Sequence, residues 1–269
     1  MDPTKLVVGA GIAILVGGGG YGVSALFSGD GMPDYVVLSV GNPSSTADTL
    51  GKLYGNYLVA PYGSRGKESN GDVTKSNNSD WWEWSYKRWE KDLKKGSTLS
   101  DEFKDNQKIN GAFSITTPTS GTAKALNQVC EEVYGKQKED ITHDTGNPNK
   151  KNLDHDLWKY CSFFTAKPKT ISETYSNGSY GLTKKAELIS VKDSSNSRFR
   201  EARNKEFYAS SGDKSGTNAT SGVFKTAFDG RNKNKKHVRE ICSGAYSITK
   251  TNNETSYPEN DVVKFCSLG

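Results

Sequence analysis

This sequence is poor in the residues from which most catalytic and metal sites are built. It has 3 histidines, 4 cysteines and 2 methionines in 269 residues, and only 33% of its residues are hydrophobic. Histidine is the side chain that most readily exchanges protons near neutral pH, so few acid–base arrangements are open to this chain. The low hydrophobic share predicts a modest core in which large aromatic side chains supply much of the buried area.

The common enzyme motifs are absent from the sequence as well. It contains no G-x-x-x-x-G-K-[ST], H-E-x-x-H, G-x-S-x-G or C-x-x-C. His143 precedes Asp144, and His155 lies between Asp154 and Asp156, but both sites lie in polar sequence that predicts solvated loops. We therefore expect no enzyme activity, no catalytic residue, no cofactor and no metal site.

What the chain does have is one long stretch without charge near its start. No charged residue occurs between Lys5 and Asp30, and the segment Leu6 to Phe27 is long enough for a helix to cross the hydrocarbon core. A cleaved signal peptide is the alternative, although the stretch is long for one and lacks an Ala-x-Ala site. We expect residues 1–29 to form a single transmembrane anchor in the plasma membrane, with the lipid bilayer as partner.

The rest of the chain is polar and is expected outside the cell. Residues 30–44 are rich in Gly, Ser, Pro and Asp and predict a polar stalk between anchor and body. The net charge is +5, with Lys and Glu interspersed, which predicts some attraction for anions but no nucleic-acid partner. The densest basic run, Lys233 to Arg239, is interpreted as a solvated helix end.

Three blocks of the chain recur in the same order, which indicates an internal duplication. In the first block, Trp81 and Trp89 align with Phe199 and Phe207, and we expect these four aromatic residues to be core positions of the repeat. The aligned blocks are Asn78–Trp89 with Asn196–Phe207, Lys124–Cys130 with Lys236–Cys242, and Asp156–Ser162 with Asp261–Ser267. We predict two modules, residues 45–166 and 167–269.

The spacing of apolar residues predicts mainly helical modules. In the first block Trp81, Trp84 and Trp89 recur on the period of a helix, and residues 122–134 show the same pattern. The end pieces 152–164 and 260–268 suit either helix or strand, and 111–117 is a candidate strand. The predicted class is therefore mainly α, or α+β with a little strand. Trp82 and Tyr86 have no aromatic counterpart in the second copy, so they are the residues to test for ligand binding.

The 4 cysteines fall at matching points of the two copies. Four cysteines allow three connectivities, and the duplication favours Cys130–Cys161 and Cys242–Cys266. An exported location permits disulfides. Free thiols and a metal site remain alternatives, although the histidines do not occupy equivalent positions in the two copies.

The Gly-rich apolar span, the block ending Lys87-Arg88-Trp89 and the block Asp156 to Ser162 resemble large paralogous families of membrane-anchored proteins in haemotropic mycoplasmas. The resemblance implies a protein on the surface of a wall-less bacterium that parasitises red cells. It implies an antigen, decoy or attachment role, with a host-cell surface or an antibody as partner. It carries over no functional residues. The alternative function is an exported hydrolase with an active site that gathers Asp154, His155 or Glu132.

Overall fold

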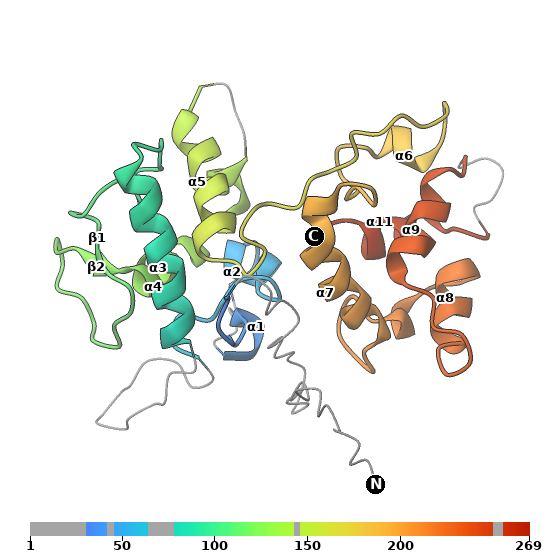
Figure 1. Ribbon diagram of the computed structural model, residues 1–269. Helices are drawn as coiled ribbons and strands as arrows, with labels where there is room; N and C mark the ends of the chain where they lie inside the picture. Colours follow the sequence, from blue (N-terminus) through green and yellow to red (C-terminus); the bar gives the residue numbers. More distant parts are fainter. Residues whose placement is uncertain (1–30, 42–45, 64–77, 143–145, 250–254) are drawn as a thin grey trace, which may run out of the picture. The chain divides into compact units, whose positions relative to one another are not determined.

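The computed structural model is mainly helical and describes residues 31–41, 46–63, 78–142, 146–249 and 255–269 (Figure 1). The predicted anchor, Leu6 to Phe27, lies outside these ranges. Within them, no helix combines the length and the apolar character that a membrane crossing requires. The chain divides into two compact units, residues 1–167 and 168–269, here called the first and the second unit.

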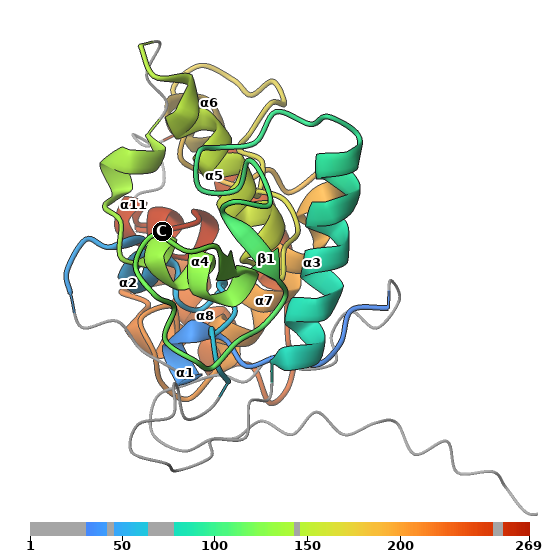
Figure 2. The same cartoon turned by 90° about the vertical axis from the view of Figure 1, so that its left-hand side faces the viewer.

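The first unit is built on three helices, α3, α4 and α5, which contact one another (Figure 1, Figure 2). Two very short strands, β1 and β2, pair in parallel beside α4. The strand expected at 111–117 does not form, because β1 ends at Gly111 and residues 112–117 are not in a strand. The described elements are α1 (Leu38–Gly41), α2 (Leu50–Tyr54), α3 (Ser79–Lys94), β1 (Ile109–Gly111), β2 (Lys124–Ala125), α4 (Leu126–Tyr134), a 3₁₀ turn (Lys138–Ile141) and α5 (Pro148–Tyr160).

Helix α3 shows how the sequence pattern produces the packing. Trp81, Trp82, Ser85 and Trp89 form its buried stripe, because residues three or four apart lie on one helix face. The Trp89 indole donates a hydrogen bond to the Phe103 carbonyl at 2.7 Å, so its polar edge is satisfied inside the core. The large indole rings thus supply the buried area that aliphatic residues do not.

The polar stalk expected at residues 30–44 is only partly outside the body, so that boundary was wrong. Tyr35, Val37 and Leu38 are buried in the first unit. Val37 forms an antiparallel bridge with Val59, and the amide of Asn78 binds the backbone of Val36. The folded body therefore begins before residue 45, because these hydrogen bonds to distant segments draw the polar stretch into the core.

The second unit packs its helices around Phe207, whose ring lies 5.0 Å from that of Phe265 in an edge-on arrangement. Helix α8 has no counterpart among the expected elements, although Phe224, Ala227 and Phe228 occur at helical spacing and are buried. The described elements are α6 (Tyr180–Thr183), a 3₁₀ turn (Ser194–Asn196), α7 (Ser197–Tyr208), a 3₁₀ turn (Gly216–Asn218), α8 (Gly222–Asp229), α9 (Val238–Tyr246) and α11 (Glu259–Cys266).

The two units repeat the same internal connections. Tyr134 donates its hydroxyl hydrogen bond to the carbonyls of Val59 or Cys161, and Tyr246 does the same to those of Ile189 or Cys266. Each unit also joins the same segments by isolated antiparallel bridges. These bridges are Val37–Val59, Thr49–Gln137 and Leu58–Ser162 in the first unit, and Thr170–Ile189, Ser179–Thr249 and Leu188–Ser267 in the second.

The recurring sequence blocks occupy equivalent places in this arrangement. Trp81, Trp89, Phe199 and Phe207 are all buried. The two end pieces, for which helix and strand were both open, are helices α5 and α11. Each unit therefore places its matching blocks on three helices, in the order α3, α4, α5 and α7, α9, α11.

Candidate functional site

The cysteines form the two disulfides that the duplication favours. Cys130 is bonded to Cys161 and Cys242 to Cys266, so the first bond joins α4 to the end of α5 and the second joins α9 to α11. No cysteine is free, which contradicts the alternatives of free thiols and of a cysteine metal site. Among the described residues, no group of His, Cys, Asp and Glu is arranged to hold a metal ion.

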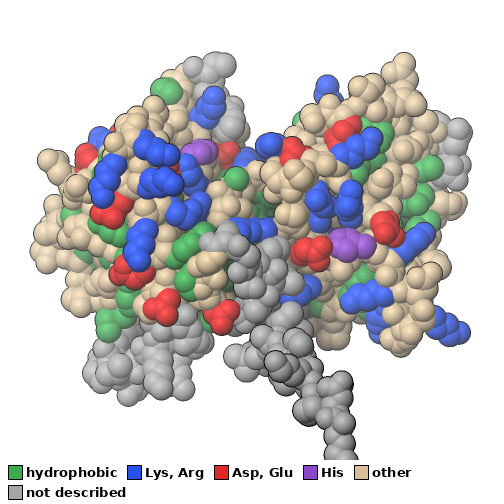
Figure 3. Space-filling view, viewed as in Figure 1, with side chains coloured by type: hydrophobic (Ala, Val, Ile, Leu, Met, Phe, Trp, Pro, Cys, Tyr) green, Lys and Arg blue, Asp and Glu red, His purple; other side chains and the backbone are tan. Residues whose placement is uncertain are grey.

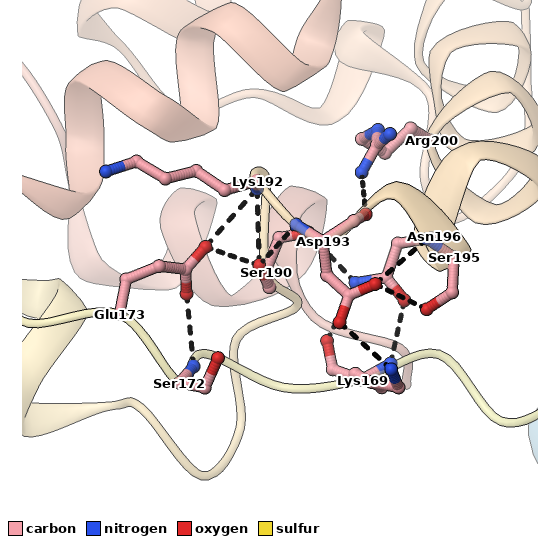
Figure 4. A network of polar contacts seen from close by, with 9 residues as sticks. All are labelled: Lys169, Ser172, Glu173, Ser190, Lys192, Asp193, Ser195, Asn196 and Arg200. Atoms are coloured by element: carbon pink, nitrogen blue, oxygen red, sulfur yellow. Dashed lines mark hydrogen bonds and ion pairs between the residues drawn. The ribbon is translucent and has the colours of Figure 1, made fainter.

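A network of polar contacts in the second unit surrounds a turn before α7 (Figure 4). Ser190 donates its hydroxyl to Glu173 at 2.5 Å and accepts hydrogen bonds from the backbone N–H groups of Lys192 and Asp193. A second Glu173 oxygen accepts from the Ser172 N–H at 3.0 Å. The Ser190 hydroxyl and the Glu173 carboxylate thus make their hydrogen bonds within the turn that they stabilise.

The pKa values of two carboxylates in this turn also argue against a role in acid–base catalysis. Burial raises the pKa of Glu173, but hydrogen bonds from Ser190 and from nearby backbone N–H groups outweigh it and lower the pKa overall. Hydrogen bonds from Ser195, and then from Lys169, lower the pKa of Asp193 to about 2. Carboxylates with depressed pKa values are weak bases, so this network is suited to fixing the turn.

Helix α5 carries the acid–base candidates that the sequence suggested. Asp154 and Asp156 are buried on this helix, so the expectation of solvated loop residues was wrong. Asp154 accepts hydrogen bonds from the Trp158 indole at 3.0 Å and from Lys167 at 2.8 Å. Asp156 accepts from the Ser100 N–H at 2.7 Å and contacts the His155 ring at 3.0 Å. The two carboxylates therefore serve different structural partners.

Ser100, His155 and Asp156 come nearest to a hydrolytic triad. His155 contacts the carboxylate through Nδ1, as a triad histidine would, and its side chain is 57% exposed. Ser100 contacts the same carboxylate through its backbone N–H, whereas its hydroxyl is buried and makes no hydrogen bond within the described part of the chain. A nucleophile needs its hydroxyl directed at the base and open to substrate, so this geometry does not form one.

A cleft of about 610 Å³ lies beside α4 in the first unit. Its charged lining is balanced and partly paired internally, because Lys124 contacts Glu132 and Lys136 lies 3.0 Å from Glu102. Asp154 and His155 do not line it. Of the three residues named for a hydrolase site, this cleft therefore contains Glu132 alone.

The remaining sequence candidates fall into ordinary structural roles. Trp82 is fully buried and donates its indole N–H to the Ala60 carbonyl at 3.2 Å, so this candidate for ligand binding offers no exposed surface to a ligand. Tyr86 is half-buried, with its ring 5.2 Å from that of Trp89. His237 caps α9 by accepting a hydrogen bond from the Arg239 N–H. His143 lies outside the described residues.

Sequence reasoning missed the polar turn of the second unit because its partners are distant in the chain. Asp193 followed by Ser195 is a recognisable cap signal, since such side chains bind the N–H group two residues on. Nothing local pairs Glu173 with Ser190. Comparisons with protein-family models, with curated proteins and with solved structures find no match to this chain.

Proposed function

We propose that this chain is a non-enzymatic surface protein that a plasma membrane holds through residues 6–27, with the two helical units outside the cell. The pair of disulfides is the observation that carries the proposal. Such bonds persist in oxidising compartments and are rare where thiols are kept reduced. The uncharged segment from Leu6 to Phe27 supplies the anchor in this scheme.

The low hydrophobic share of the chain, 33%, gives a reason why such a body would use disulfides. Each bond closes a loop, of 31 residues in the first unit and 24 in the second. On the chain-entropy account, loops of this size contribute roughly 3–4 kcal/mol each, which is a large part of the stability of a small domain. Such a body keeps its fold while its surface loops vary, as display or attachment to a host cell requires.

Protease treatment of intact cells tests the proposed location. Trypsin added outside should remove both units and leave an N-terminal tag with the membrane fraction, while a cytosolic marker stays intact. Labelling of thiols in unreduced lysate should leave all cysteines unmodified. Protection of both units from trypsin, or labelling of the cysteines without reductant, would contradict the proposal.

Binding of the purified protein to host cells separates attachment from passive display. An attachment protein should bind intact host cells saturably, whereas an antigen or decoy should be recognised by antibodies without such binding. The measurement is flow cytometry with the full-length protein in neutral detergent micelles. Protein whose disulfides have been reduced and alkylated is the matched control, because it keeps its composition but loses its constrained fold.

A further inference from the structure

Basic side chains gather on the outward side of α3 and on the adjoining α5 in the first unit. Figure 3 shows this concentration of Lys and Arg over the part of the unit where α3 lies. The two helices contact each other, and Lys151, His155 and Lys159 of α5 recur every four positions, which places these three on one side of the helix. We call this set the basic face; it comprises Lys87, Arg88, Lys91, Lys94 and Lys95 of α3 and its C-cap, and Lys151, His155 and Lys159 of α5.

The charges on α3 are segregated by position. At a rise of 1.5 Å per residue, the stretch from Lys87 to Lys95 extends about 12 Å along the helix. The acidic residues Asp80 and Glu83 lie in the N-terminal half of α3, whereas the stretch from Lys87 to Lys95 holds five basic residues and two acidic ones, Glu90 and Asp92. The basic face therefore belongs to the C-terminal half of α3, where basic residues outnumber acidic ones although Glu90 lies on the same side as Lys94.

Most cations of the basic face have no acidic partner. No carboxylate of the described residues lies within ion-pair distance of Lys87, Lys91, Lys94, Lys95 or Lys151, although the structure has many ion pairs elsewhere. Surface lysines without partners repel one another weakly in water, so their accumulation offers the fold no stability. A favourable interaction with the helix dipole explains only the lysines in the last turn of α3.

Two acidic groups near the basic face, Asp92 and Asp156, are already occupied. Asp92 accepts hydrogen bonds from Lys159 and from the Tyr160 hydroxyl, both at 2.8 Å. Burial raises the pKa of Asp92, but these bonds outweigh it and lower the pKa overall, so the carboxylate stays ionised and neutralises mainly Lys159. Asp156 is bound to the Ser100 N–H. From Lys87 to Lys95 the five basic residues outnumber Glu90 and Asp92, so this end of α3 projects a net positive potential.

The basic face offers charged groups for binding an anion, but few exposed apolar or aromatic side chains that could contact lipid tails or nucleic-acid bases. The tryptophans Trp81, Trp82 and Trp89 point into the core, whereas a membrane-binding helix turns its apolar side outward. The ring of Trp84 is covered by the Arg88 guanidinium, which lies 4.5 Å from its centre, so it offers no open platform for base stacking. Among the described residues, Leu53 is the only exposed large hydrophobic side chain.

We propose that the basic face binds a sulfated polysaccharide. A linear polyanion matches a linear array of ammonium groups, and sulfates need no apolar contact to be bound. Such polymers are found outside cells, so the choice of this polyanion rests on the proposed surface location. Because the contacts are solvent-exposed charge pairs, binding weakens steeply as salt is added.

Heparin is the probe, and full-length protein in neutral detergent micelles is the sample. The test variant replaces Lys87, Lys91 and Lys94 by Gln together; the matched control replaces Lys185, Lys233 and Lys236, three exposed lysines of the second unit, in the same way. Both variants lose the same net charge. The Kd for heparin at about 0.15 M salt should rise about tenfold or more in the test variant and about twofold or less in the control.

Competing ligands decide between partners. Vesicles of phosphatidylserine with phosphatidylcholine and duplex DNA are measured at the same salt concentration. Tighter binding of either than of heparin, an equal loss of heparin binding in both variants, or no heparin binding by the unmodified protein would overturn the proposal. Unchanged thermal unfolding of the test variant shows that its loss is not misfolding. Since binding is measured on purified protein, this result is independent of the trypsin experiment that tests the surface location.

Discussion

Asn78 and Asn196 make the same three hydrogen bonds in the two units. The side-chain oxygen of Asn78 accepts from the Val36 N–H at 2.7 Å, and its amide donates to the carbonyls of Val36 and Ala60. Asn196 accepts from the Lys169 N–H at 2.8 Å and donates to the carbonyls of Lys169 and Ser190. Each asparagine thus joins two backbone segments to the start of the first helix of its matching blocks, α3 or α7.

Replacing either asparagine by Ala should therefore destabilise its unit strongly. Each change leaves buried backbone groups without partners, and we expect a loss of about 2–4 kcal/mol in the free energy of unfolding. Urea unfolding followed by tryptophan fluorescence reports Asn78→Ala, since all 5 tryptophans precede residue 168. Far-UV circular dichroism reports Asn196→Ala.

Asn218→Ala is the matched control for the asparagine variants. Asn218 is exposed and donates one hydrogen bond, to the Gly212 carbonyl at 2.9 Å. Its replacement should change stability by about 0.5 kcal/mol or less. If the variants at Asn78 and Asn196 behave like this control, the asparagines do not hold the two units in the way described.

Removing one disulfide should destabilise mainly the unit that contains it. Changing both Cys130 and Cys161 to Ala opens a loop of 31 residues, and changing Cys242 and Cys266 opens one of 24. The similar loop lengths predict similar losses, about 3–4 kcal/mol each. Hydrogen exchange read out by peptide mapping would show which unit has loosened. Equal loosening of both units by either pair of changes would disprove the assignment.

Lys214 should make the second unit more stable as the pH rises from about 8 to 10. Burial, and next the positive charge of Arg203, lower the pKa of Lys214 to about 8, whereas lysine in an unfolded chain titrates near ~10.4. Between these values the folded chain binds fewer protons than the unfolded chain, so the free energy of unfolding increases with pH.

The Lys214→Met variant should lack this rise, and the exposed Lys185→Met should keep it. Urea unfolding between about pH 7.5 and 9.5 avoids most tyrosine ionisation, which works in the opposite direction because burial raises the pKa of Tyr246. The same pH dependence in the Lys214 variant and in the unmodified protein would show that another group causes it.

Gly222 and Gly96 provide a matched pair with the same backbone conformation. Both have positive φ, +66° and +71°, a region that costs a residue with a Cβ roughly 1 kcal/mol. A Cβ at Gly222 would lie 2.2 Å from the Ser256 carbonyl oxygen, whereas one at Gly96 would meet nothing within 4 Å. Gly96→Ala should therefore cost about 1 kcal/mol and Gly222→Ala about 3 kcal/mol or more, as measured by thermal unfolding. Equal losses of stability in the two variants would mean that the backbone at Ser256 moves easily to accommodate the added methyl group.

The predictable part of this fold is the part whose sequence blocks occur in two copies. Trp81 and Phe199 begin the same block, and the cysteines fall in the same order in both copies, so the helices and the disulfide pairs could be inferred without coordinates. The apolar spacing of α8 was also readable, yet α8 has no partner in the aligned blocks and was passed over.

The candidate site was less predictable, because burial is decided by distant segments. Asp154 and Asp156 look like solvated loop residues in sequence, yet Lys167 and the Ser100 N–H satisfy them inside the first unit. The same holds for Glu173, whose partner Ser190 is 17 residues away. A local pattern carries no information about such partners.

By itself, the sequence determined the uncharged N-terminal stretch and the doubled blocks, and it favoured the mainly helical class and the pairing of Cys130 with Cys161 and of Cys242 with Cys266. Each of these is a matter of spacing along the chain or of one copy matching the other. Only the tertiary structure decided that Val37 belongs to the body, that Trp82 is buried and that the lysines of α3 and α5 share one face. The reason is physical: backbone hydrogen bonding, burial and the summing of charge depend on which segments meet in space.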